Sequence, residues 1–393
     1  MKVWILIFVC MFSMPLLVAV LHFRMRKGQI LKIRQDYVKN ARYFGRSFSA
    51  LVEKALPEMK NGMIMLSRQE KVLETDGKQE FVQPEIEDLV IARNTIFCPQ
   101  QEDLHFQKEI YSEKDALFVK ENIRLRAVYS KKRLLFGNKI RLLRWADAEH
   151  AVAVYDECDL GERVSSGEQL VIGFENVFHS LYAPVIRLGQ RPEEPDRFME
   201  GRDPRIFRMP VMNSHEYNRH YIDDDMVTEG GTVPYTIISR GDIKVIEDII
   251  LQGDIHSDGA VRIMENASVL GNIFAENDIL LEKNATVLGN IFTQGNIIFE
   301  EGASAGQPDK IISVVARGTI TFYGGNYVYG YVVSEGGGKI LKSDREVLGE
   351  YCFPGEPVHE EKITFRDLSE YENVDFQGFR GDIYVKEAII PEG

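Results

Sequence analysis

Cysteine is scarce in this chain of 393 residues, and the few cysteines are never close together. Cys10, Cys98, Cys158 and Cys352 stand far apart and form no CxxC pair. That spacing is not typical of a zinc site or of a dense disulfide framework. We therefore expect a protein of a reducing compartment.

Positive charge is also in deficit, because 47 Lys and Arg stand against 60 Asp and Glu, which gives a net charge of −13. A general nucleic-acid surface needs clustered cations to meet the phosphates, so no nucleic-acid partner is expected. The chain also lacks a G-x-S-x-G motif, a P-loop and a dinucleotide fingerprint, and we predict that it is not an enzyme. With 44% hydrophobic and 27% charged residues, it has the composition of a folded protein.

The chain begins with a long uncharged stretch, and residues 1–23 are predicted to be a transmembrane anchor. As a helix, the stretch from Val3 to Leu21 would be about as long as the hydrocarbon core is thick. No A-x-A cleavage site of a signal peptide follows before His22. Cations cluster after the stretch, whereas only Lys2 precedes it, and the cluster is Arg24, Arg26, Lys27, Lys32 and Arg34. The positive-inside rule then predicts a single-pass protein of the cytoplasmic membrane with the bulk of the chain in the cytoplasm.

A repeat of 18 residues marks the second half of the chain, and each repeat divides into three steps of six residues. The stretch from Asn266 to Phe292, NASVLGNIFAENDILLEKNATVLGNIF, states the pattern N-A-[ST]-V-L-G-N-I-F twice. The steps of six land almost always on an aliphatic or small residue. The predicted inward column is Ile243, Ile249, Ile255, Val261, Ile273, Ile279, Ile291 and Ile297. Because residues i and i+2 share a strand face, and Gly-Asn and similar pairs supply positive φ at corners, three short strands and three corners make one coil.

Chains wound in this way are parallel β-helices, in which similar coils stack to continue one apolar interior. The period does not fix the handedness. The predicted organisation, beyond the anchor, follows the periodicity and its interruptions along the chain. It comprises a juxtamembrane helix and connecting segment at 24–114, degenerate coils at 115–190, a charged Pro-rich insertion at 191–236, clear coils at 237–335, and a C-terminal segment at 336–393. That last segment contains GDIYVKEAII, which matches GDIKVIEDII of Gly241 to Ile250 and predicts an extra coil or half coil.

The tandem V-L-G-N-I-F coils with Gly-Asn corners, over about Gly241 to Ala305, resemble the bactofilins, the polymer-forming cytoskeletal proteins of bacteria. The resemblance implies a right-handed, triangular β-helix without a cofactor. It also implies end-to-end homopolymers on the inner face of the cytoplasmic membrane that act as a scaffold for cell-shape or envelope-synthesis proteins. This chain departs from typical members in its full apparent membrane span and in the long sequence ahead of the clear coils.

One outward column of the predicted coils is aromatic: His256, Phe274 and Phe292 follow one another at the spacing of the repeat. Apolar side chains in a row on an outer face indicate a docking surface for a partner or for a second filament. The alternative is that the insertion or the C-terminal segment covers them.

Two other functions stay open. A left-handed hexapeptide helix has coils of the same length and would suit an acyltransferase with His256 as the general base. The clear coils offer no second or third histidine for a zinc site, and the cluster His215 to Asp225 meets metal-ligand spacing only loosely, so no metal is expected. An exported glycan-binding β-helix would require cleavage of the N-terminal stretch.

Overall fold

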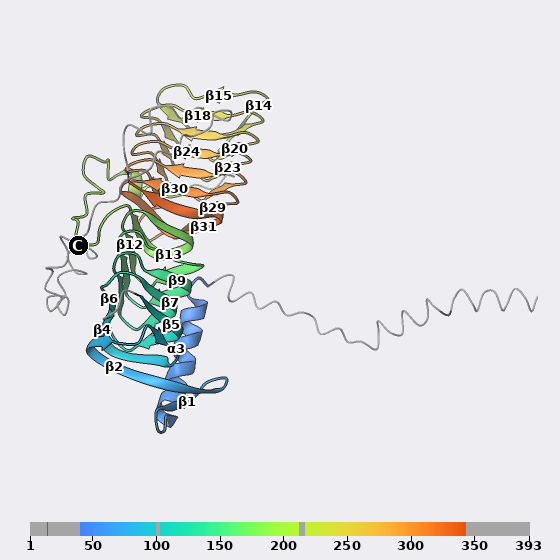
Figure 1. Ribbon diagram of the computed structural model, residues 1–393. Helices are drawn as coiled ribbons and strands as arrows, with labels where there is room; N and C mark the ends of the chain where they lie inside the picture. Colours follow the sequence, from blue (N-terminus) through green and yellow to red (C-terminus); the bar gives the residue numbers. More distant parts are fainter. Residues whose placement is uncertain (1–13, 15–39, 100–102, 212–216, 343–393) are drawn as a thin grey trace, which may run out of the picture. The chain divides into compact units, whose positions relative to one another are not determined.

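The computed structural model describes residue 14 and residues 40–99, 103–211 and 217–342. In these residues the protein is an all-β, parallel β-solenoid of about 15 turns spaced about 18 residues apart, with one short helix, α3 (Tyr43–Ala55). The predicted all-β class and the coil length are therefore confirmed. Figure 1 shows the strands stacked as successive rungs.

The strands fall into two tracts along the chain. The first tract, residues 63–188, contains β1 (Met63–Met65), β2 (Gln69–Phe81), β3 (Glu85–Ile86), β4 (Leu89–Pro99), β5 (Leu104–Ser112), β6 (Ala116–Phe118), β7 (Ile123–Ser130), β8 (Arg133–Phe136), β9 (Arg141–Ala148), β10 (Ala151–Val154), β11 (Arg163–Ser166), β12 (Gln169–Ile172) and β13 (Asn176–Leu188). Short 3-10 helices, η1 (Leu56–Glu58) and η2 (Ile206–Arg208), lie in the connections.

The second tract, residues 219–341, contains β14 (Arg219–Ile222), β15 (Met226–Val227), β16 (Thr232–Val233), β17 (Thr236–Ser239), β18 (Ile243–Val245), β19 (Ile250–Leu251), β20 (Ile255–Ser257), β21 (Val261–Ile263), β22 (Ser268–Val269), β23 (Ile273–Ala275), β24 (Ile279–Leu281), β25 (Thr286–Val287), β26 (Ile291–Thr293), β27 (Ile297–Phe299), β28 (Ser304–Ala305), β29 (Ile312–Ala316), β30 (Ile320–Tyr323) and β31 (Asn326–Leu341). Each strand from β14 to β27 pairs in parallel with the third strand after it. Three strands therefore make one coil.

The interior of the second tract is the apolar column that the six-residue spacing predicts. Ile255, Ile273 and Ile291 lie in register on successive coils. All eight residues of the predicted column are at most 1% exposed. A coil this small buries little surface alone, so the stack of identical side chains is what stabilises it.

The coils turn their corners in two ways, whereas the sequence predicts only positive φ at Gly-Asn and similar pairs. Positive φ occurs at Asp248, Asn266 and Asn284, with angles of 57°, 59° and 58°, and the same column continues to Gly302 at 77°. The glycine of each Gly-Asn pair serves close approach instead, since a Cβ on Gly271 would overlap the carbonyl oxygen of Gly253. The Asn or Asp that follows the glycine then joins coils, because its side-chain oxygen accepts a hydrogen bond from the next coil's backbone N–H, as Asn272 does from Asn290 and Asp254 from Asn272.

The last coil of the first tract pairs with the last coil of the second tract. β13 and β31 pair antiparallel from Asn176 with Ile340 to Leu188 with Asn326, so each strand runs round the end of its own solenoid. Across this junction the rings of Tyr182 and Tyr331 lie 4.5 Å apart. An end that would otherwise expose unpaired backbone groups is thus satisfied within the chain.

A segment of residues 190–211, here called the strap, leaves the junction and packs on the outside of the second tract. Its Phe198 and Phe207 are buried against Leu270 and Leu288. An ion pair of 2.9 Å between Arg191 and Asp156 holds its beginning to the first tract.

The coils extend beyond the predicted boundaries on both sides. Parallel pairing begins already where Val72 meets Leu89, upstream of residue 115, and the second tract begins at Arg219 inside the predicted insertion. Register shifts near residues 75–77, 106–109 and 125–127 break the six-residue spacing in the first tract.

Three predictions lie wholly or partly outside the described residues: the span Val3 to Leu21, apart from Met14, the beginning of the juxtamembrane segment at 24–39, and the extra coil at 381–390. Within the part of the chain that the structure describes, no helix has the length and apolar character needed to cross a membrane.

Candidate interaction surfaces

The three predicted surface residues lie together on one outer face of the second tract. His256 pairs in register with Phe274, and Phe274 with Phe292. Their rings are stacked, with centroids 4.8 Å and 5.4 Å apart. The register extends the line in both directions, and we call the whole set the aromatic column: Tyr221, Ile238, His256, Phe274, Phe292, Val315 and Val333.

The aromatic column is accessible among the described residues. Phe274 is 37% exposed and Tyr221 is 67% exposed. A shallow hollow of about 400 Å³ follows the column and is bordered by Arg317 and Glu335. The described part of the insertion does not cover it, because the strap packs on the side of Leu270 instead.

The imidazole of His256 stacks on the ring of Phe274. Burial lowers its pKa below the ordinary 6.5, and Arg219 lowers it further while Asp254 acts in the opposite direction. Neither a hydrogen bond nor an ion pair joins its imidazole to another of the described residues. A general base is usually oriented by a hydrogen-bonded acceptor, and the described surroundings of His256 supply none.

The same face continues through the junction onto the first tract, where a helix covers it. The pairings run from Phe292 through Val315 and Val333 to Ser180 on β13. Farther along, α3 lies on this face (Figure 1) and buries Val52 against the side chains of Tyr111, Tyr129 and Trp145.

Polar contacts fix α3 at its edge. Glu53 accepts hydrogen bonds from Ser49 at 3.0 Å and Tyr111 at 3.2 Å, and it forms a 2.9 Å ion pair with Lys131. The Lys131 ammonium holds the pKa of Glu53 below its usual value. One outer face therefore carries an amphipathic helix on one tract and, on the other, an aromatic column that no described segment covers.

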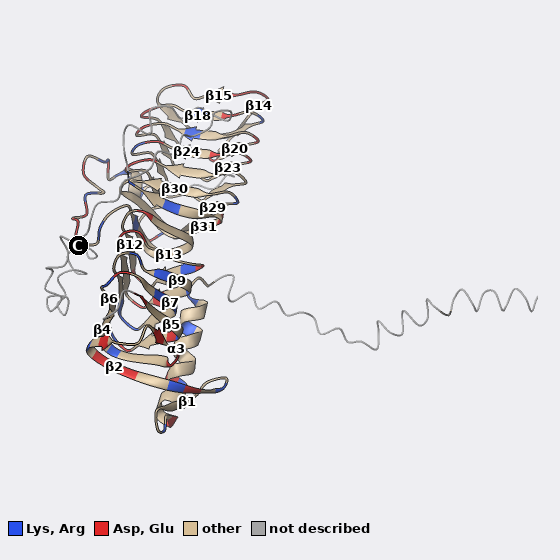
Figure 2. Cartoon of the chain, viewed as in Figure 1, with Lys and Arg blue, Asp and Glu red and all other residues tan. Residues whose placement is uncertain are grey.

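A second candidate surface is the first coil of the second tract. β14, β15 and β16 pair with β17, β18 and β19 on one side, and no described strand pairs with their other side. The loop before β15 carries Asp223, Asp224 and Asp225 (Figure 2). Unpaired backbone edges of this kind accept a further strand or coil.

Comparison of the chain with family models gives no match. Neither the curated proteins nor the solved structures give one. The likeness to bactofilins therefore stays a prediction from the coil pattern.

Sequence reasoning missed four members of the aromatic column. Ile238 stands one repeat before His256 and could have been found by continuing the pattern. Val315 is hidden because the chain between Phe292 and Val315 is longer than one repeat. Tyr221 lies in the stretch interpreted as an insertion, and Val333 lies in the long strand of the junction.

Proposed function

We propose that the protein is a membrane-anchored, non-enzymatic scaffold of the bactofilin type, which self-assembles through solenoid ends and recruits envelope-synthesis proteins. The proposal includes a right-handed, triangular winding, an anchor in residues 1–23, and a location of the coils on the cytoplasmic side of the inner membrane. No cofactor is part of it.

The observation that carries the self-assembly is the outer edge of β14, β15 and β16, which pairs with no other strand that the structure describes. The junction between β13 and β31 is a precedent within this chain, because two solenoid ends meet there as antiparallel strands from Asn176 to Leu188 of β13. A second copy that placed its own β14–β16 edge against this one would pair backbone groups in the same manner. Such an isologous contact is the commonest symmetry of homo-oligomers.

Growth beyond a dimer requires the other end of the chain's solenoid, at β2. Its described partners are β4 on one side and, only through residues 69–71, β1 on the other. Charges alternate along this strand, from Glu70 and Lys71 to Lys78 and Glu80. Edges with charges pair reluctantly, so we propose that the β14–β16 contact forms first and the β2 contact completes the filament.

Recruitment of partners is assigned to the aromatic column, and we propose that its occupant is an amphipathic helix of a partner protein. The support is continuity, because α3 already lies on this face over the first tract. Helices bind apolar grooves through side chains at i, i+3, i+4 and i+7. The charged residues that border the hollow are Asp258, Glu276, Glu335 and Arg317, an excess of acids that favours a basic polar edge on such a helix.

The test of self-assembly compares two lysine substitutions. Tyr221→Lys places a charge at the open edge, whereas Met199→Lys places one on the strap, where Met199 is 46% exposed. Sedimentation of the two variants and of the wild-type chain should show assemblies for the wild type and Met199→Lys, and smaller species for Tyr221→Lys. Equal sedimentation of both variants refutes assembly through this edge.

A further inference from the structure

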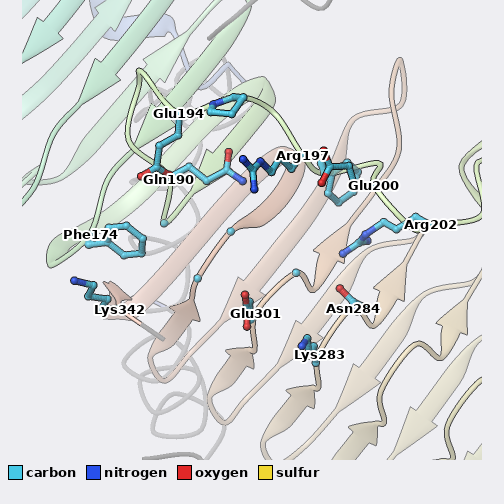
Figure 3. A pocket seen from close by; sticks show the side chains of 16 residues that line it. Phe174, Gln190, Glu194, Arg197, Glu200, Arg202, Lys283, Asn284, Glu301 and Lys342 are labelled. Carbon is cyan, nitrogen blue, oxygen red and sulfur yellow. The ribbon is translucent and has the colours of Figure 1, made fainter. Parts of the chain in front are cut away.

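A cavity of about 600 Å³ lies between the strap and the corners of the second tract (Figure 3). The strap contributes Arg202 and Glu200, and the coil corners contribute Lys283, Asn284 and Glu301. Nothing in the assembly or recruitment described above uses this space. Its walls hold several polar groups that converge, which is typical of small-molecule sites.

Arg202 is the inner group of this wall. Its Nη1 donates to Ser304 Oγ at 3.1 Å and lies 3.4 Å from Thr286 Oγ1, and its guanidinium lies 4.3 Å from the centre of the Phe198 ring. These partners are neutral, and no carboxylate is among the groups that influence its charge in the described residues. Burial lowers the pKa of Arg202 to about 10, which leaves it charged at neutral pH.

A partly buried guanidinium without a counter-ion is costly, because neutral hydroxyls replace only part of its hydration. Most such groups in proteins pair with a carboxylate or phosphate. Arg205, three residues along the strap, shows the usual arrangement with its 2.9 Å ion pair to Asp203. Among the described residues, Arg202 therefore lacks the anionic partner that a guanidinium in this environment usually has.

Gly302 leaves the space beside Arg202 open. The column of positive-φ corners reads Asp248, Asn266, Asn284 and then Gly302, so a side chain is missing only in its last member. A Cβ on Gly302 would lie 3.2 Å from Arg202 Nη2 and would overlap Asn284 Oδ1. The missing side chain is what allows a ligand to reach both groups.

The surrounding charges restrict what can enter. Four cations line the cavity, Arg197, Arg202, Lys283 and Lys342, against the three exposed carboxylates Glu194, Glu200 and Glu301. The lining therefore has a surplus of one positive charge, which suits a single anionic group better than a polyanion. Asn284 offers an amide to a hydroxyl group beside the anion. We propose that the cavity is a binding site for a small hydroxylated molecule that carries a single carboxylate or phosphate group.

The experiment is calorimetric titration of the full chain in detergent with glucuronate, glucose 6-phosphate and glucose. These probes share a sugar ring and differ in the anion, so the two charged probes distinguish carboxylate from phosphate. We expect at least one charged probe to bind, and we expect the affinity for glucose to be lower by a factor of about ten or more. Equal binding of glucose, or no binding of either charged probe, overturns the proposal.

Three variants locate the site. Arg202→Met and Gly302→Asn should each weaken the charged probe by about tenfold or more, whereas Arg205→Met on the same strap should bind it as the wild type does. Gly302→Asn keeps the residue type of Asn266 and Asn284 at a positive-φ corner, so the coil should retain its fold. If Gly302→Asn binds normally while Arg202→Met does not, the arginine acts only by holding the strap, and the site is refuted.

Discussion

Two adjacent residues, Ile273 and Phe274, should lose different amounts of stability on truncation. Ile273 is fully buried in the interior column, so Ile273→Ala should cost about 2–5 kcal/mol of stability, which is typical of a large aliphatic side chain removed from a core. Phe274 keeps 37% of its surface exposed, and its ring stacks between the rings of His256 and Phe292. Phe274→Ser should therefore cost only about 1–2 kcal/mol.

The assay is urea unfolding of both variants and the wild type, followed by circular dichroism and by hydrogen exchange of individual coils. Solenoids unfold in part, coil by coil, so hydrogen exchange shows where each change acts. Ile273→Asp and Ile291→Asp extend the series, because a buried carboxylate without a partner should abolish folding. If Phe274→Ser costs as much as Ile273→Ala, the aromatic column is part of a core, and its role as a docking surface is refuted.

Three further changes test other contacts. His256→Phe should remove a pH dependence of stability. Burial lowers the pKa of His256 below 6.5, so the unfolded chain takes up the proton first and wild-type stability should fall as the pH drops through about 6.5. Wild-type melting temperatures that show no such fall with pH would contradict this. Gly338→Ala should destabilise the junction by about 1–3 kcal/mol, because a Cβ there overlaps the ring of Phe178, and faster exchange confined to β13 and β31 would record it. Lys131→Met should cost at most about 1 kcal/mol of stability and have no effect in high salt, since the side chains of the Lys131–Glu53 ion pair are 41% and 44% exposed. A larger cost in urea unfolding would mean that the position of α3 depends on this ion pair.

The coils themselves follow from local sequence, and this is why they could be predicted. Ile255, Ile273 and Ile291 stand one repeat apart, and one strand alternation places each inward and its neighbour outward. The outward position of His256, Phe274 and Phe292 follows from the same rule. The spacing fails where a coil gains residues, as before Val315.

The junction and the strap could not be predicted in this way. Antiparallel pairing of β13 with β31 joins segments that are far apart in the sequence and leaves no period in either. The cavity beside Arg202 depends on how the strap returns along the coils, which no local pattern encodes. The role of Gly302 is visible only once its corner is aligned with Asn266 and Asn284.

Negative-stain electron microscopy of the fragment Lys27 to Gly393, purified without nucleotide or metal, tests the central claim most directly. Self-assembly through solenoid ends predicts extended filaments a single solenoid wide, and predicts that Tyr221→Lys abolishes them. Discrete monomers of the wild-type fragment, at concentrations where it is folded, would contradict the scaffold proposal.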